Sequence, residues 1–138
     1  MRQATTTLVV ATTGQGFTEI TGEVAKWLSA AGLDEGLLTL LCRHTSASLL
    51  IQENAARAVR ADLSRWLERL APEGGHYAHD DEGPDDMPAH LRATLTGVTL
   101  SIPFSGGRMR LGTWQGIYLA EHRRAAHRRE IAVHAIGD

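Results

Sequence analysis

Short strand-like segments, separated by turn residues, are the feature that most restricts what this chain can fold into. They cover residues 4–11, 17–20, 37–42, 49–51, 98–103, 108–111, 117–122 and 130–136. Segments of this length that are rich in β-branched and apolar residues predict strands. Residues 37–42 are apolar throughout, which predicts a strand buried on both faces. Ser105-Gly106-Gly107 predicts a hairpin turn between two of the later strands.

Helical periodicity is confined to residues 21–31, 54–70 and a third segment after residue 86. In the third segment, Leu91 and Leu95 are expected to face the core. Residues suited to begin or end helices stand at the boundaries of these segments: Thr21, Gly32, Asn54 and Pro88. The chain is therefore predicted to combine a predominant sheet with two or three helices.

Length and composition indicate one soluble domain spanning residues 1–138. Hydrophobic residues make up 43% and charged residues 22%, and the net charge of −2 predicts no attraction to nucleic acid or to an anionic membrane. The single cysteine, Cys42, cannot form an intramolecular disulfide, and residues 1–7 lack the apolar core of a signal peptide. We therefore expect a cytoplasmic protein.

The central stretch, residues 76–90, is the predicted functional centre. It holds three histidines and five carboxylates within fifteen residues: His76, His79 and His90 with Asp80, Asp81, Glu82, Asp85 and Asp86. Imidazole beside carboxylate is the combination that binds a metal ion or moves a proton near neutral pH.

Three histidines are the candidate metal ligands: His44, His79 and His90. His44 lies in a polar insertion between two apolar strands, which is otherwise explained by a turn with a surface histidine. Neutral imidazoles favour zinc or another transition metal, whereas the carboxylates of the central stretch favour magnesium. The histidine spacing matches no short zinc signature, so the divalent ion is left open.

Two features of the last third are candidates for substrate binding. Arg108 precedes Gly112-Thr113-Trp114-Gln115-Gly116, whose glycines permit close approach of a ligand and whose Thr113 and Gln115 offer hydrogen bonds. A β-bulge with a packed Trp114 is the alternative interpretation. The arginines of residues 123–129 are interpreted as a solvated turn.

Several of these elements resemble the YjbQ-like family over nearly the whole chain. The resemblance is carried by His44-Thr45-Ser46-Ala47-Ser48, by residues 79–90, by Leu111-Gly112-Thr113-Trp114-Gln115-Gly116-Ile117 and by Glu121-His122-Arg123. It implies a compact α+β domain with a mixed, largely antiparallel sheet, assembled as a homotrimer. After Glu53-Asn54 the family commonly continues with Asp-Pro, whereas this chain has Ala55-Ala56.

The resemblance also implies a reaction, a weak secondary thiamine-phosphate synthase activity. This transferase joins a pyrimidine pyrophosphate to a thiazole phosphate and releases pyrophosphate. The residues expected to carry catalysis are His44, Glu82 and Asp86, with a divalent ion on the carboxylates. The residues expected to bind substrate are Ser46, Arg108, Thr113, Trp114 and Gln115.

Two other functions are compatible with the same residues. One is a metal-dependent hydrolase with zinc on His44, His79 and His90. The other is a non-enzymatic trimer that binds a small phosphorylated molecule. In an oligomer, a site shared between subunits would explain why one small domain concentrates so many polar residues.

Overall fold

The computed structural model describes all 138 residues. The strands are β1 (Arg2–Ala11), β2 (Gly16–Glu19), β3 (Gly36–Cys42), β4 (Ala47–Glu53), β5 (Thr99–Ser105), β6 (Arg108–Met109), β7 (Gln115–Glu121) and β8 (Arg128–Gly137). The helices are α1 (Thr21–Ala31), α2 (Arg57–Leu70) and α3 (Asp86–Thr96). None of the three combines the length and the apolar character that crossing a membrane requires.

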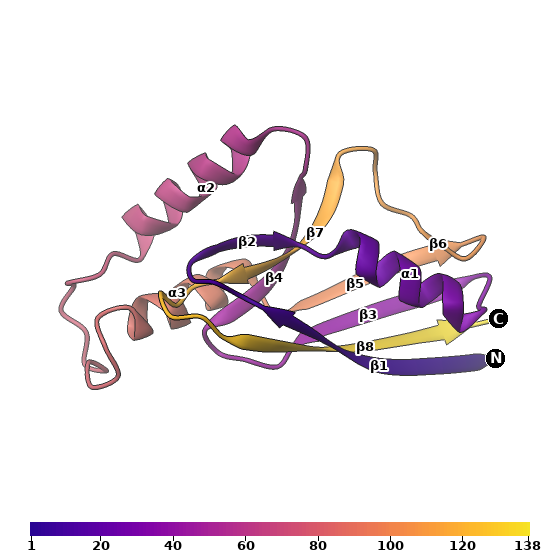
Figure 1. Ribbon diagram of the computed structural model, residues 1–138, viewed down its shortest axis with the longest axis horizontal. Helices are drawn as coiled ribbons and strands as arrows, with labels where there is room; N and C mark the ends of the chain where they lie inside the picture. Colours follow the sequence, from indigo (N-terminus) through magenta and orange to yellow (C-terminus); the bar gives the residue numbers. More distant parts are fainter.

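The strands form two sheets (Figure 1). The larger sheet has the order β1-β8-β3-β5-β6 and the smaller one β2-β7-β4. Every strand pair is antiparallel and there are three helices, so the predicted α+β domain with largely antiparallel pairing and two or three helices is confirmed. The expectation of a mixed sheet is wrong, since neither of the two sheets contains a parallel pair. A parallel pair would need a crossover connection between neighbouring strands.

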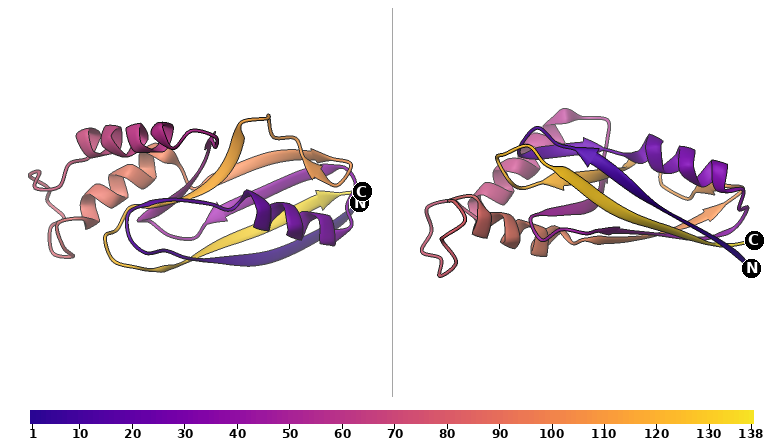
Figure 2. Two further views of the ribbon diagram at one scale, coloured as in Figure 1. Left: turned by 45° about the horizontal axis from the view of Figure 1, so that its top comes forward. Right: turned by 60° about the horizontal axis from the view of Figure 1, so that its bottom comes forward.

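One hydrophobic core lies between the larger sheet, the smaller sheet and α1. α1 contributes Val24 and Leu28, and β3 contributes Leu38 and Leu40 from alternate positions. Figure 2 shows α1 on one side of the larger sheet, with no helix on its opposite side. The prediction that residues 37–42 are buried on both faces is wrong in the single chain, since Leu37 is 41% exposed.

Two of the expected helix caps are wrong by a few residues. α1 begins at Thr21 itself, whose hydroxyl accepts the Ile117 N–H at 2.8 Å instead of capping the helix. At α2, the Glu53 carboxylate accepts the Ala56 N–H at 3.0 Å, in place of the expected cap by Asn54. The expected end of α1 is confirmed, because Gly32 adopts the left-handed conformation with φ of 71°.

Helix α3 buries small and polar residues rather than leucines. Leu91 and Leu95 are exposed, so the prediction that they face the core is wrong. The buried positions are Asp86, Pro88, Ala89, Arg92 and Ala93, and the two alanines let α3 approach β4 closely. Local apolar periodicity pointed to the wrong face because the buried face of this helix also carries charged groups.

A buried ion pair joins the ends of β7 and β8. The Arg129 Nε donates to the Glu121 carboxylate at 2.7 Å, and Thr12 donates to the same carboxylate at 2.8 Å. Burial alone would raise the pKa of Glu121, but these donors and the Arg129 charge hold it below its usual value. The pair therefore fixes the junction from which residues 122–127 leave the sheet.

Replacing Arg129 with Met should lower the free energy of unfolding by about 3–5 kcal/mol, because it leaves a buried carboxylate without its counterion. Urea denaturation followed by circular dichroism measures this loss. The double variant Glu121→Gln/Arg129→Met should recover part of it. The matched control Arg43→Met removes an exposed pair with Glu130 and should cost no more than about 1 kcal/mol. Equal losses in the two arginine variants would contradict this account.

Candidate metal centre

The loop between α2 and α3 and the first turns of α3 bring four side chains together. Asp86 is the first residue of α3, and His90 follows one helical turn later on the same face. The loop returns His79 and Glu82 to this face. The side chain of Asp86 is 4% exposed, whereas those of His79 and Glu82 are open to solvent.

Two of these side chains, His79 and His90, meet at one carboxylate oxygen of Asp86. The His79 Nε2 lies 2.8 Å and the His90 Nε2 3.0 Å from the Asp86 Oδ2. The Glu82 carboxylate lies 3.3 Å from the His79 Nε2. One ligand atom from each residue falls within 4.8 Å of the others. Two imidazoles and one or two carboxylates form a donor set suited to a divalent transition metal, and this group could hold one.

Hydrogen bonds from outside the group orient the His90 ring and the Asp86 carboxylate. The His90 Nδ1 donates to the Thr45 carbonyl oxygen at 2.8 Å, which leaves its Nε2 directed at Asp86. The Arg123 Nη1 donates to the Asp86 Oδ1 at 2.6 Å, which leaves the Oδ2 for the histidines. Partners of this kind fix the tautomer and orientation of metal ligands in proteins.

The central stretch is anchored by Arg123. Its Nε donates to the Asp85 Oδ2 at 3.0 Å and its Nη2 to the Glu82 carbonyl oxygen at 3.1 Å. The interpretation of residues 123–129 as a solvated turn is therefore wrong for Arg123 and Arg129. The missed signal was the acidic pair Asp85-Asp86, which needs a cation once it is buried.

The contacts within this cluster shift three pKa values, each toward the charged form of its group. Burial alone would raise the pKa of Asp86, but the hydrogen bond from His79 and the charges of His90 and Arg123 lower it. Burial would likewise raise the pKa of Asp85, and its bonds to the Arg124 N–H and to Arg123 lower it. The hydrogen bond to Asp86 raises the pKa of His79. Both aspartates are therefore carboxylates at neutral pH.

His44 lies outside this group. Its Nε2 accepts the Glu130 N–H at 2.7 Å, so the proton of the neutral ring is on Nδ1. Burial and the nearby charge of Arg129 lower the pKa of His44, which keeps the ring neutral. His44 nevertheless lines a cavity of about 570 Å³ together with Thr45 and His90. The structure thus places it beside the cluster, with its Nε2 already occupied.

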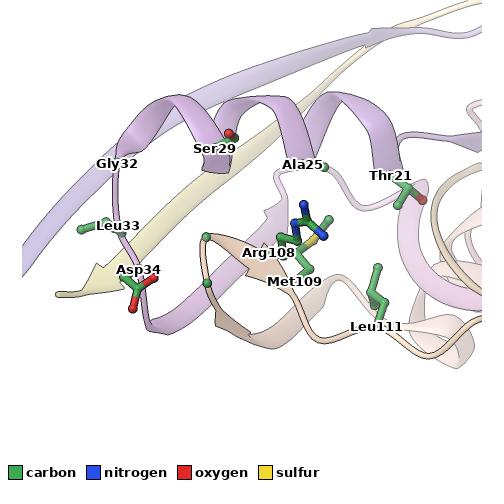
Figure 3. A pocket seen from close by; sticks show the side chains of 11 residues that line it. Thr21, Ala25, Ser29, Gly32, Leu33, Asp34, Arg108, Met109 and Leu111 are labelled. Carbon is green, nitrogen blue, oxygen red and sulfur yellow. The ribbon is translucent and has the colours of Figure 1, made fainter.

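The predicted substrate residues do not gather at the cluster within one chain. The Ser46 hydroxyl accepts from Arg129 at 3.0 Å and is buried. Arg108 lies in a separate groove between α1 and β6 (Figure 3). Thr113, Trp114 and Gln115 stand at the start of β7, whereas Glu121 ends it, roughly 20 Å further along at the rise of a strand. Trp114 is 62% exposed.

His122 is a buried histidine that the sequence did not single out. Its Nε2 lies 2.8 Å from the Ser48 hydroxyl, which in turn lies 2.6 Å from the Thr96 hydroxyl. Burial and the nearby charge of Arg92 lower the pKa of His122 to about 4. The only available signal was its place in Glu121-His122-Arg123, one of the elements of the family resemblance.

Comparisons with known proteins agree with this fold. The family model described as UPF0047 protein YjbQ-like matches residues 6–138. The chain belongs to this family. A UPF0047 protein of Synechocystis sp. is 46% identical over 138 residues, which are 99% of this chain and 94% of that protein. The UPF0047 protein YjbQ of Escherichia coli O157:H7 is 44% identical over 118 residues, which are 85% of this chain and 86% of that protein.

Solved structures confirm the YjbQ-like fold. An uncharacterized conserved protein of the YjbQ/UPF0047 family from Clostridium acetobutylicum has a TM-score of 0.88 at 33% identity, covering 95% of this chain and 99% of that one. A conserved hypothetical protein from Thermus thermophilus has a TM-score of 0.81 at 38% identity, with the same coverage. The names of these relatives state no reaction, so they support the family and the fold alone.

The lowered pKa of His122 predicts a loss of stability in acid. The unfolded chain takes up this proton near pH 6.5 and the folded chain only near pH 4. The stability that a neutral His122 contributes is therefore present above pH 6.5 and is lost as the pH falls to 4, by roughly 3 kcal/mol. Urea denaturation at a series of pH values measures the slope.

In His122→Asn this part of the slope should be absent, while the control His76→Ala, which changes an exposed loop histidine, should keep it. An identical pH dependence in wild type and His122→Asn would show that His122 does not resist protonation.

Proposed function

We propose that this protein is a metal-dependent enzyme whose centre is formed by His79, Asp86 and His90, with Glu82 beside them. The observation that carries the proposal is the approach of both histidine Nε2 atoms to the Asp86 Oδ2, at 2.8 and 3.0 Å. We propose these ligands in place of the expected trio of His44, His79 and His90, because the Nε2 of His44 already accepts a backbone N–H.

The donor set favours a zinc-type ion over magnesium, because two imidazole nitrogens suit a transition metal and magnesium prefers oxygen ligands. Such an ion supplies Lewis-acid chemistry for hydrolysis or group transfer. The cavity of about 570 Å³ beside His90 is within the size range of small-molecule sites. We propose that it receives a small phosphorylated molecule, in keeping with the family resemblance.

Two side chains near the proposed centre can handle protons: His44, which lines this cavity, and Glu82, which lies beside His79. His44 is neutral and carries its proton on Nδ1, so it can donate to a leaving group or an anionic oxygen. Glu82 is largely exposed and lies 3.3 Å from the His79 Nε2, so its carboxylate can accept a proton or complete the ligand set. This division of roles supports hydrolysis or transfer of a phosphate-bearing group.

Thiamine-phosphate synthase activity is the narrower candidate. The exposed indole of Trp114 favours it, because a planar pyrimidine needs a free aromatic face. In one chain Trp114 and Gln115 lie at the opposite end of β7 from the cluster, so this reaction requires a neighbouring subunit to supply them. Pyrophosphate release from the two thiamine precursors, lost in Trp114→Ala, is the assay for it.

We also propose the homotrimer that the resemblance implies, because the chain exposes apolar side chains on two surfaces. The outer face of the larger sheet carries Leu37, Leu41 and Val9, all exposed, and α2 and α3 expose Trp66, Leu70, Leu91 and Leu95. Apolar surface of this extent is covered in most stable proteins by another chain.

Metal analysis of untagged protein tests the proposed centre. Wild type should hold a stoichiometric zinc-type ion, and His79→Ala, Asp86→Asn and His90→Ala should lose most of it because each removes a ligand atom. Arg123→Met, which removes an orienting contact, should weaken the metal by about 10–100-fold. Elemental analysis and competition with a chelating dye measure these effects.

His44→Ala and the exposed-loop control His76→Ala should retain the metal, and His44→Ala alone of these two should lose turnover. If Asp86→Asn retained its metal, the proposed centre would be contradicted. Metal lost in His44→Ala would restore the trio of ligands expected from the sequence.

The assembly is tested by light scattering after size exclusion. The expected mass is three times the 15.0 kDa of the chain. Leu37→Glu/Leu41→Glu should shift the mass toward that of one chain if the outer sheet face is the interface. The control Ala30→Glu, at an exposed position of α1, should leave the mass unchanged. A wild type that elutes with the mass of one chain would refute the trimer.

A further inference from the structure

Arg92 is a buried arginine that forms no ion pair with a carboxylate. It is 6% exposed, and its Nη2 donates to the Ala71 carbonyl oxygen at 3.0 Å. Its Nε is enclosed and has no hydrogen-bond partner. The other buried arginine, Arg129, and the partly buried Arg123 each bind carboxylates. A buried guanidinium without a counterion is costly, so its neutralising partner is expected to come from outside the chain.

Two cavities meet at Arg92, of about 190 Å³ and about 260 Å³. Gln15, Glu68 and Arg92 line both of them. Each has room for a small oxyanion and several waters, since a water occupies about 30 Å³. The cavities are lined by residues of α2, by Arg92 of α3, by residues 15–17 and by residues of the segment 121–124, and neither cavity is lined by Asp86 or His90.

His122 provides a second polar group for the smaller cavity. It lines that cavity, and its Nε2 is taken up by Ser48, which leaves Nδ1 without a partner in the chain. With the ring neutral, Nδ1 can donate a hydrogen bond. Arg92 supplies the charge, and the two side chains come from α3 and from the end of β7.

The carboxylates at these cavities are mostly compensated. Glu121 is bound to Arg129, and Glu73 is paired with Arg124. Glu68 is the exception: it is exposed on α2 and forms no ion pair with Arg92. It is therefore the one group that would oppose an anion at the mouth of the cavities.

We propose that the Arg92 cavities bind a small tetrahedral oxyanion of the phosphate or sulfate class, at a site separate from the metal centre. Arg92 forms the charged floor, His122 donates from the side, and Glu68 tunes affinity at the entrance. Free phosphate and the phosphoryl end of a larger molecule share this chemistry. The small volume favours the free ion.

The test uses full-length protein carrying Asp86→Asn, treated with chelator, so that phosphate on the metal centre does not contribute and failure of that centre leaves the result intact. Inorganic phosphate is titrated by calorimetry and by thermal unfolding. We expect phosphate to bind and to raise the unfolding temperature. Arg92→Met should weaken binding at least tenfold while unfolding in phosphate-free buffer no earlier than its parent, because it removes an uncompensated charge.

Two variants sharpen the result. Glu68→Gln should tighten phosphate binding, because it removes the opposing charge, and the exposed arginine control Arg57→Met should leave binding unchanged. A phenyl phosphate monoester that binds as well as phosphate would identify the phosphoryl group of a larger molecule as the ligand. Absence of phosphate binding, or equal binding by Arg92→Met, overturns the proposal. The proposal is also overturned if Arg92→Met and Glu68→Gln, made separately, both lower the stability of the protein. Glu68 would then be the partner of Arg92.

Discussion

The contact between the buried Asp86 carboxylate and Arg123 is the constraint on which the candidate site depends. The two residues are 37 positions apart, one at the start of α3 and the other just after β7. A buried carboxylate requires a cation, and Arg123 also holds Asp85 and the Glu82 carbonyl oxygen. One guanidinium therefore holds the central loop against the end of the sheet. Because it also fixes Asp86, the His79 and His90 side chains can both contact the Asp86 carboxylate.

Local patterns are enough to find most strands and the central stretch. A strand alternates its side chains with period two, so Leu38 and Leu40 can be assigned to a core from the sequence alone. Composition alone predicts residues 76–90 as the functional centre, and the structure brings His79, Glu82, Asp86 and His90 into one group. The i, i+4 spacing of Asp86 and His90 belongs to one helix face, which is also a local property.

What escapes the sequence depends on contacts between distant segments. Nothing near His44 in the chain shows that its Nε2 accepts a hydrogen bond from Glu130, 86 residues away. Arg123 and Arg124 look alike in sequence, yet the first binds two aspartates while the second pairs with Glu73 at the surface. Leu91 and Leu95 are wrongly predicted to face the core because apolar periodicity carries no information on which polar groups also need burial.

Helix α3 contributes side chains to both the candidate metal centre and the Arg92 cavities. Its Asp86 and His90 face the candidate metal centre, while Arg92, only two residues further along, faces the cavities behind it. The consecutive residues His122 and Arg123 divide between the same two sides. An uncompensated Arg92 charge would oppose a divalent ion at the candidate metal centre, because charges within a protein interact through a medium far less polarisable than water. An oxyanion at Arg92 would cancel that opposition. If both proposed sites are occupied, binding at either one would favour binding at the other, and by linkage the two effects would be equal.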